Sequence, residues 1–171
     1  QTGSGKTIAF LAPLITHLMN NPQNKGLILL PTREIALQVM EVLRKIVGSS
    51  KEICSALLIG GESMPKQLTQ LKRNPNLIIG TPGRICDHLE RRSLSLQQTN
   101  FLILDEVDRM LDMGFSKPLS RICQTLCPKR QTLMFSATLS PVIEQLAQRY
   151  LTNPKRIAIT TVFQPAPEIM Q

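Results

Sequence analysis

The sequence of 171 residues has no tryptophan, one tyrosine and five phenylalanines. Proteins that stack the bases of a single strand use rows of aromatic side chains, so this composition argues against a stacking platform. No apolar run reaches the length of about 18 residues that a membrane-spanning helix needs. Hydrophobic residues make up 42% and charged residues 19%, which is typical of a soluble globular domain and excludes a disordered chain. The length suits one domain.

Cysteine is also scarce, and the four cysteines are Cys54, Cys86, Cys123 and Cys127. Their spacing contains no CxxC pair, and neither His17 nor His88 is placed to complete a zinc site. We therefore predict reduced thiols that pack as small apolar groups, and we assign the two histidines no role.

Acidic residues are few beside basic ones: 12 Asp and Glu stand against 20 Lys and Arg, which gives a net charge of +8. A basic domain favours polyanionic partners such as nucleic acid, although charge alone is a weak indication. The first residues do not have the charged and then apolar segments of a signal or transit peptide. We interpret Gln1 as a truncation point, because a phosphate-binding loop normally follows a strand.

Strand-length apolar runs alternate with stretches of helical period. The runs cover residues 26–30, 53–59, 76–80, 101–105 and 131–135. Apolar residues recur at helical spacing over residues 8–18, 35–46, 119–126 and 142–150. This alternation predicts right-handed βαβ units and a parallel sheet with helices on both faces.

Proline and the C-terminal region qualify this pattern. Pro13 lies inside the first helical stretch, where it should kink or locally restrict the helix. Residues 156–159 are a candidate sixth strand. We place the end of the domain near Thr161, and residues 162–171, which contain two prolines, are expected to form a linker.

The opening residues QTGSGKT match the end of a phosphate-binding loop. Glycines let backbone amides turn toward phosphate oxygens, and the N-terminus of the following helix adds a favourable dipole. In this pattern Lys6 reaches the β- and γ-phosphates and the Thr7 hydroxyl binds Mg²⁺. The alternative is a glycine turn that only caps a helix.

The acidic stretch DEVD directly follows the apolar run FLIL. Asp105, at the strand end, can hold a metal ion through its water shell. Glu106 can orient, or take a proton from, the water that attacks the γ-phosphate. Asp108 is close enough to contact SAT, where Ser136 and Thr138 offer hydroxyl groups. The alternative is that these carboxylates cap the next helix.

Three further polar groups follow strands: PTRE at residues 31–34, Gly60-Gly61, and TPGR at residues 81–84. The C-terminal ends of parallel strands share one edge, where open α/β sheets bind ligands. The groups offer backbone amides, hydroxyls and the guanidinium groups of Arg33 and Arg84, which suit sugar-phosphate contacts. Each alone is explained by turn chemistry, but together they predict sequence-independent binding of a strand.

The motifs, in this order, resemble those of the DEAD-box ATP-dependent RNA helicases. The first lobe of that family carries AxTGSGKT, PTRELA, GG, TPGR, DEAD and SAT, and the present chain shows QTGSGKT, PTREIALQ, GG, TPGR, DEVD and SAT. The resemblance covers nearly the whole chain. It implies a RecA-like P-loop NTPase lobe, ATP and Mg²⁺ as cofactors, and ATP hydrolysis coupled to local unwinding of RNA duplexes in the full-length protein.

The resemblance also implies residue roles. The residues expected to bind ATP are Thr2, Gly3, Ser4, Gly5, Lys6 and Thr7, and those expected to bind the metal are Thr7 and Asp105. The expected catalytic set is Lys6, Asp105, Glu106, Asp108, Ser136 and Thr138, with the last two coupling hydrolysis to strand separation. The residues expected to line the RNA path are Arg33, Gly61, Thr81, Gly83 and Arg84.

The chain departs from the family pattern at a few places. Val107 replaces the usual alanine and is expected to add two methyl groups beside the metal site, at a cost of ~1–3 kcal/mol unless a neighbour compensates. Ile35 for leucine is conservative. The family's glutamine-containing adenine-recognition segment and its second RecA-like lobe do not appear among these residues. We therefore expect the 171 residues alone to bind ATP weakly and to unwind nothing.

The expected partners are RNA, contacted through its backbone, and the second lobe of the same protein. A cytoplasmic monomer without membrane association is expected. Two alternatives stay open: an ATP-driven translocase that acts on DNA, and a non-catalytic, ATP-switched scaffold that clamps RNA.

Overall fold

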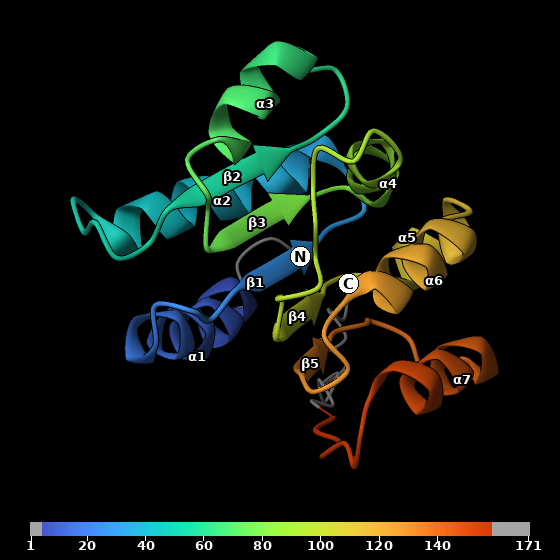
Figure 1. Ribbon diagram of the computed structural model, residues 1–171. Coiled ribbons are helices and arrows are strands. Elements are labelled where there is room, and N and C mark those ends of the chain that lie inside the picture. The colour runs from blue at the N-terminus through green and yellow to red at the C-terminus, as the bar shows by residue number, and fades with distance from the viewer. Residues whose placement is uncertain (1–4, 159–171) are drawn as a thin grey trace, which may run out of the picture.

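Five short strands form the centre of the computed structural model, which describes residues 5–158 (Figure 1). The strands are β1 (Gly26–Leu29), β2 (Ser55–Leu58), β3 (Leu77–Gly80), β4 (Phe101–Leu104) and β5 (Gln131–Met134). Every residue of β1, β3 and β4 is buried, as expected for strands covered on both faces. Each strand lies inside one of the apolar runs, which confirms those predictions.

The sheet is parallel throughout, in the order β2-β3-β1-β4-β5. Its register aligns the C-terminal ends: Leu29 lies beside Gly80 and Leu104, Gly80 beside Leu58, and Leu104 beside Met134. The loops that follow all five strands therefore leave the sheet at one edge. This edge carries every motif from PTRE onward.

The helices are α1 (Lys6–Asn20), α2 (Arg33–Val47), α3 (Met64–Leu71), α4 (Pro82–Glu90), α5 (Val107–Asp112), α6 (Ser116–Thr125) and α7 (Pro141–Tyr150). Helices α1 and α2 cover one face of the sheet, α4 to α7 cover the other, and α3 packs beside the edge strand β2 (Figure 1). The periodic stretches predicted α1, α2, α6 and α7. They did not delimit α3, α4 and α5, which have at most nine residues and so too few turns to show a period.

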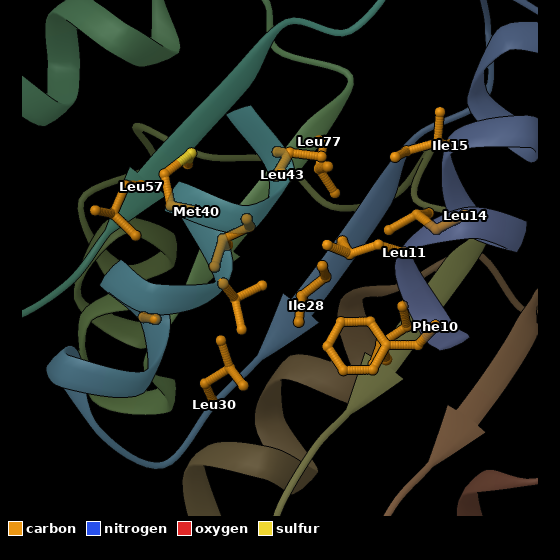
Figure 2. Packing of buried hydrophobic residues seen from close by; sticks show 14 of the residues in the cluster. Phe10, Leu11, Leu14, Ile15, Ile28, Leu30, Met40, Leu43, Leu57 and Leu77 are labelled. Atoms are coloured by element: carbon orange, nitrogen blue, oxygen red, sulfur yellow. The ribbon is translucent and has the colours of Figure 1, made fainter. Parts of the chain in front are cut away.

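Two apolar cores result, one on each side of the sheet. Ile28 and Leu30 face α1 and α2, where they meet Phe10, Leu14 and Met40 (Figure 2). Leu27 and Leu29 face the opposite way and pack with residues of α4 to α7. Alternate residues of one strand thus serve both cores, as the period of a strand requires.

The structure bears on the expectations about Pro13 and the C-terminal region. Helix α1 continues through Pro13 as a single helix of 15 residues, and the expected kink or local restriction stays a prediction. The prediction of a sixth strand is wrong for the described residues, because residues 155–158 form no strand and Ile157 is 87% exposed. Ile159, Thr161 and residues 162–171 lie outside the described residues.

The prediction of buried, reduced thiols is confirmed for two of the four cysteines. All four are free thiols, and Cys86 and Cys123 are buried, whereas Cys54 and Cys127 are only half-buried. Burial raises the pKa of the Cys123 thiol to about 11, which keeps it protonated and unreactive. Within residues 5–158 no cluster of three or more His, Cys, Asp or Glu side chains is arranged to hold a metal ion, and no helix is long and apolar enough to cross a bilayer.

Val107 lies in the core that α4 to α7 cover, and its side chain is 0% exposed. Its methyl groups belong to an apolar core that also contains Leu29 and Leu104, and their expected place beside the metal site stays a prediction.

We predict that Val107→Ala destabilises the chain by about 1–3 kcal/mol, because it removes two methyl groups from a packed site and leaves a cavity. Urea unfolding of the 171-residue chain measures this difference. Val142→Ala is the matched control, since Val142 is 54% exposed at the start of α7. Equal unfolding midpoints for the two variants would contradict the packing of Val107.

Candidate nucleotide and nucleic-acid site

The end of the phosphate loop enters α1 through Gly5. Its φ of 69° lies in the left-handed region that glycine adopts without steric cost. Lys6 and Thr7 then form the first turn of α1, whose backbone amides have no acceptor within the helix and whose dipole favours an anion. Thr2, Gly3 and Ser4 lie outside the described residues.

Lys6 and Asp105 form an ion pair between α1 and the end of β4. The Lys6 Nζ lies 2.7 Å from Asp105 Oδ1, and Asp105 is 3% exposed. Burial raises the pKa of Asp105 above its usual value, and the Lys6 ammonium offsets only part of this rise. The pair brings the lysine of the phosphate loop and the first carboxylate of DEVD together, as their motifs predict.

The geometry at Asp105 fits a magnesium ion. Both close contacts of the carboxylate, from Lys6 Nζ and from the Glu106 backbone amide at 2.9 Å, use Oδ1. The structure gives Oδ2 no hydrogen bond from any residue between 5 and 158. Mg²⁺ in nucleotide sites is typically held by one or two carboxylates, waters and phosphate oxygens, so the unbonded oxygen of a single buried carboxylate suits this ion.

Glu106 adopts a backbone conformation that is unusual for its residue type. Its φ of 53° and ψ of 51° place it in the left-handed region, at a cost of order 1–3 kcal/mol for a residue with a side chain. Its Oε2 lies 3.4 Å from Nη1 of Arg109. Arg109 was not predicted, although a glutamate and an arginine three residues apart at the start of a helix are a signal for such a pair.

Asp108 bonds to the SAT loop across the sheet edge. Its Oδ2 accepts hydrogen bonds from the Ala137 amide at 3.1 Å, the Thr138 amide at 3.2 Å and the Thr138 hydroxyl at 3.3 Å. The predicted contact between Asp108 and Thr138 is confirmed. The predicted contact with Ser136 is wrong, because its hydroxyl is buried and finds no partner in the described part of the chain.

We predict that Asp108→Ala loosens the SAT loop, because one carboxylate oxygen holds two of its amides. Native-state hydrogen exchange of Ala137 and Thr138 should become about tenfold faster, which corresponds to ~1.4 kcal/mol. Asp112→Ala is the control, since Asp112 is an exposed residue at the end of the same helix. Unchanged exchange at both amides would show that the hydrogen bonds do not hold the loop.

A cleft of about 510 Å³ lies where PTRE and TPGR approach each other. The residues lining it are Pro31, Thr32, Arg33, Glu34, Gly60, Thr81, Gly83, Arg84, Asp87, Met113 and Phe115. Met113 and Phe115 were not predicted, because they come from the turn between α5 and α6 and follow no strand. The turn alternative holds for Thr32, whose hydroxyl accepts from the Ile35 amide and caps α2.

Within the cleft region, the Arg33 side chain lies against Gly61. A Cβ on Gly61 would be 2.8 Å from Arg33 Cζ, and the φ of Gly61 is +76°. Arg84 is anchored differently: its Nη1 donates to the Glu62 carbonyl at 3.1 Å, and its Nε lies 3.7 Å from Asp87 Oδ2. Arg33, Gly61 and Arg84, from three separate motifs, thus meet at one place.

The residues of the predicted nucleotide site and the residues that line the cleft occupy different halves of one sheet edge. Asp105 and the SAT loop follow β4 and β5, whereas the cleft follows β1, β2 and β3. The connections that follow the neighbouring strands β1 and β4 leave toward opposite faces of the sheet: β1 leads to α2 on one face, and β4 leads to α5 on the other. The crevice between two such strands is the usual ligand position in open α/β sheets. The structure therefore supports two adjacent sites and not one shared pocket.

Known proteins are similar to this chain in sequence. A chain of 42% identity over 160 residues is the DEAD-box ATP-dependent RNA helicase CshA of Bacillus licheniformis; the match covers 93% of the present chain and 33% of that protein. The ATP-dependent rRNA helicase RRP3 of Yarrowia lipolytica is 40% identical over 173 residues, which cover 100% of the chain and 36% of that protein. The chain thus spans about a third of the length of these curated relatives.

Solved structures agree with this similarity. A DEAD box protein from the hyperthermophile Methanococcus jannaschii matches with a TM-score of 0.82 and 40% identity, over 90% of this chain and 42% of that one. The yeast splicing factor Prp28 matches with a TM-score of 0.80 and 33% identity, over 89% and 39%. The predicted RecA-like fold is therefore confirmed. Residues 1–146 match the family model described as DEAD/DEAH box helicase, and the chain belongs to this family.

Proposed function

We propose that this chain is the ATP-binding first lobe of a protein that couples ATP hydrolysis to local separation of RNA duplexes. The Lys6–Asp105 pair is the observation that carries the proposal. It places the ammonium of a phosphate loop, a buried carboxylate and the neighbouring Glu106 at one helix N-terminus. Phosphoryl transfer needs mainly positioning and neutralisation of charge, and these groups supply both.

In this proposal residues Thr2 to Thr7 wrap the nucleotide phosphates with backbone amides. Lys6 would pair with the β- and γ-phosphates in place of Asp105, and Asp105 together with the Thr7 hydroxyl would hold Mg²⁺, which would neutralise charge on the phosphate oxygens. Glu106 orients the attacking water and accepts its proton. The raised pKa of Asp105 supports the exchange, because a buried carboxylate gains from a divalent cation.

The cleft is the proposed path of RNA. Arg33 and Arg84 supply positive charge, and Gly61, Thr81 and Gly83 allow the backbone to approach a phosphate closely. Contacts of this kind read no bases, so binding is expected to be independent of sequence and to weaken with salt. Asp108, Ser136 and Thr138, which follow β4 and β5 at the nucleotide end of the sheet edge, are proposed to couple the two sites.

We further propose that residues 1–161 form the lobe and that residues 162–171 lead to a second RecA-like lobe, which completes both the ATP site and the RNA groove. A cytoplasmic location and a monomeric state stay predictions that no observation tests. The isolated 171 residues are expected to bind ATP weakly. Tight binding of Mg-ATP in a titration of this chain would contradict the proposal that ATP binding needs contacts from a second lobe.

Release of a labelled strand from a short duplex tests the proposed function. The full-length protein should release RNA with ATP and fail with a non-hydrolysable analogue. Equal release from a DNA duplex would favour the translocase alternative. Stable RNA binding that responds to ATP, without release or hydrolysis, would favour the clamp.

A further inference from the structure

A chain of buried polar side chains lies beneath the Gly60-Gly61 turn. Gln67 of α3 and His88 of α4 are both 0% exposed. The sequence analysis assigned His88 no role, and Gln67 gave no signal there. Buried amide and imidazole groups cost free energy unless every donor and acceptor is used, so their partners identify what they hold.

Gln67 holds both ends of the turn. Its Nε2 donates to the Ile59 carbonyl at 2.8 Å and is 3.4 Å from the Glu62 carbonyl, so one amide group spans Gly60 and Gly61. Two acceptors on the nitrogen side fix which way the side-chain amide points. Its Oε1 is then directed at His88 Nε2, 2.9 Å away.

This orientation determines the state of His88. Because Gln67 Oε1 only accepts, His88 Nε2 must carry the proton and donate it. His88 Nδ1, 2.8 Å from Ser93 Oγ, is left as an acceptor, and the single proton of the Ser93 hydroxyl is shared between it and the His88 carbonyl oxygen at 3.1 Å. Burial, and next the charge of Arg84, lower the pKa of His88, which favours this neutral form. The donors and acceptors are thus fixed from His88 Nε2 through Gln67 to the turn.

The same turn is contacted by the arginines of the two neighbouring motifs. Arg84 Nη1 donates to the Glu62 carbonyl at 3.1 Å, the carbonyl that Gln67 also approaches. Arg33 lies against Gly61. The position of the turn therefore sets where Arg33 can lie, and Gln67 is the side chain that fixes the turn from inside.

We propose that Gln67 is a positioning residue for the RNA cleft, and that His88 and Ser93 fix its orientation. Gln67 contacts no RNA in this proposal. It holds the Gly60-Gly61 turn in the position in which both Arg33 and the backbone amides of the turn can contact a phosphate group. The inference rests on the proposed function, because it assigns the cleft to RNA. A fully bonded buried network of this kind rigidifies the segment it holds.

The substitution Gln67→Met keeps the length of the side chain and removes its hydrogen bonds. In the full-length protein we expect the Kd for fluorescent single-stranded RNA to rise about tenfold, or ~1.4 kcal/mol, while the Kd for ATP measured without RNA changes less than about twofold. The slope of log K for RNA binding against log salt concentration should also decrease in magnitude by about one, which corresponds to the loss of one phosphate contact. Gln124→Met, at an exposed position of α6, is the matched control and should leave both constants unchanged.

The two affinities separate positioning from general stability. An unchanged Kd for RNA in a folded Gln67→Met protein would overturn the inference, and so would an equal loss of ATP and RNA binding. If Gln67→Met does not fold, Ser93→Ala replaces it, since it removes the hydroxyl beside His88 Nδ1 and the His88 carbonyl and leaves Gln67 in place. Ser93→Ala is expected to weaken RNA binding about threefold with ATP affinity kept, and wild-type RNA affinity in this variant would overturn the inference. A wild-type protein that binds no RNA would overturn the proposed function itself.

Discussion

Replacing Glu106 with glutamine is expected to lower kcat for ATP hydrolysis by about 10² to 10⁴-fold, because the variant keeps the shape of the side chain and loses the base. Glu106 directly follows the buried Asp105, and its backbone is held in the left-handed region by the start of α5. Such strain is retained where the surrounding structure imposes it, and the Glu106 side chain is one-third exposed beside Arg109. The affinity for ATP should change little, because binding depends on Lys6 and the phosphate loop.

The measurement is steady-state hydrolysis by the full-length protein with saturating RNA, together with an ATP titration. Glu41→Gln is the matched control, because Glu41 is exposed on α2 and pairs only with Lys45 at 2.8 Å among the described residues. The control should hydrolyse ATP at the wild-type rate. A Glu106→Gln protein with more than half of the wild-type kcat would show that another group activates the water.

Replacing Gly61 with alanine is expected to weaken RNA binding by about 10- to 100-fold, or ~1.4–2.7 kcal/mol. Two effects combine at this position. The φ of +76° strains any residue that has a Cβ, and that Cβ would collide with the Arg33 guanidinium, which is the flexible end of a side chain and so moves away. The charge proposed to meet a phosphate is thereby displaced.

Gly60→Ala is the matched control in the same motif. Its φ is not in the left-handed region, and an added Cβ meets no atom of the described chain within 4 Å. RNA affinity should therefore stay within about twofold of wild type. Arg33→Ala should weaken binding as Gly61→Ala does, and the double variant should be no weaker than either one, since both remove the same contact. Additive losses would show that Gly61 acts on RNA independently of Arg33.

The sheet and the position of both sites were predictable from the sequence, because the signals are local. An apolar run such as FLIL is a buried strand in any α/β protein, and parallel strands bring the residues after their C-terminal ends to one edge. Asp105 and Arg33 were located by this rule alone. The same rule failed for residues 156–159, since a short apolar segment such as RIAI also occurs on an exposed surface, and Ile157 is 87% exposed.

The details of the site depend on tertiary contacts, which leave weaker traces in sequence. Ser136 was expected to bond Asp108 because it precedes Thr138 in the same loop, yet its hydroxyl turns into the protein. Gln67 and His88 are polar residues in short helices, and nothing local indicates that they meet. Met113 reaches the cleft only because α5 and α6 pack beside TPGR.

ATP hydrolysis by the full-length protein, measured with and without single-stranded RNA or DNA, tests the central claim most directly. The proposed function predicts that RNA stimulates hydrolysis, that DNA does not, and that Glu106→Gln abolishes the stimulation. Equal stimulation by DNA, or a rate indifferent to both, would contradict an RNA-coupled ATPase while leaving the fold as described.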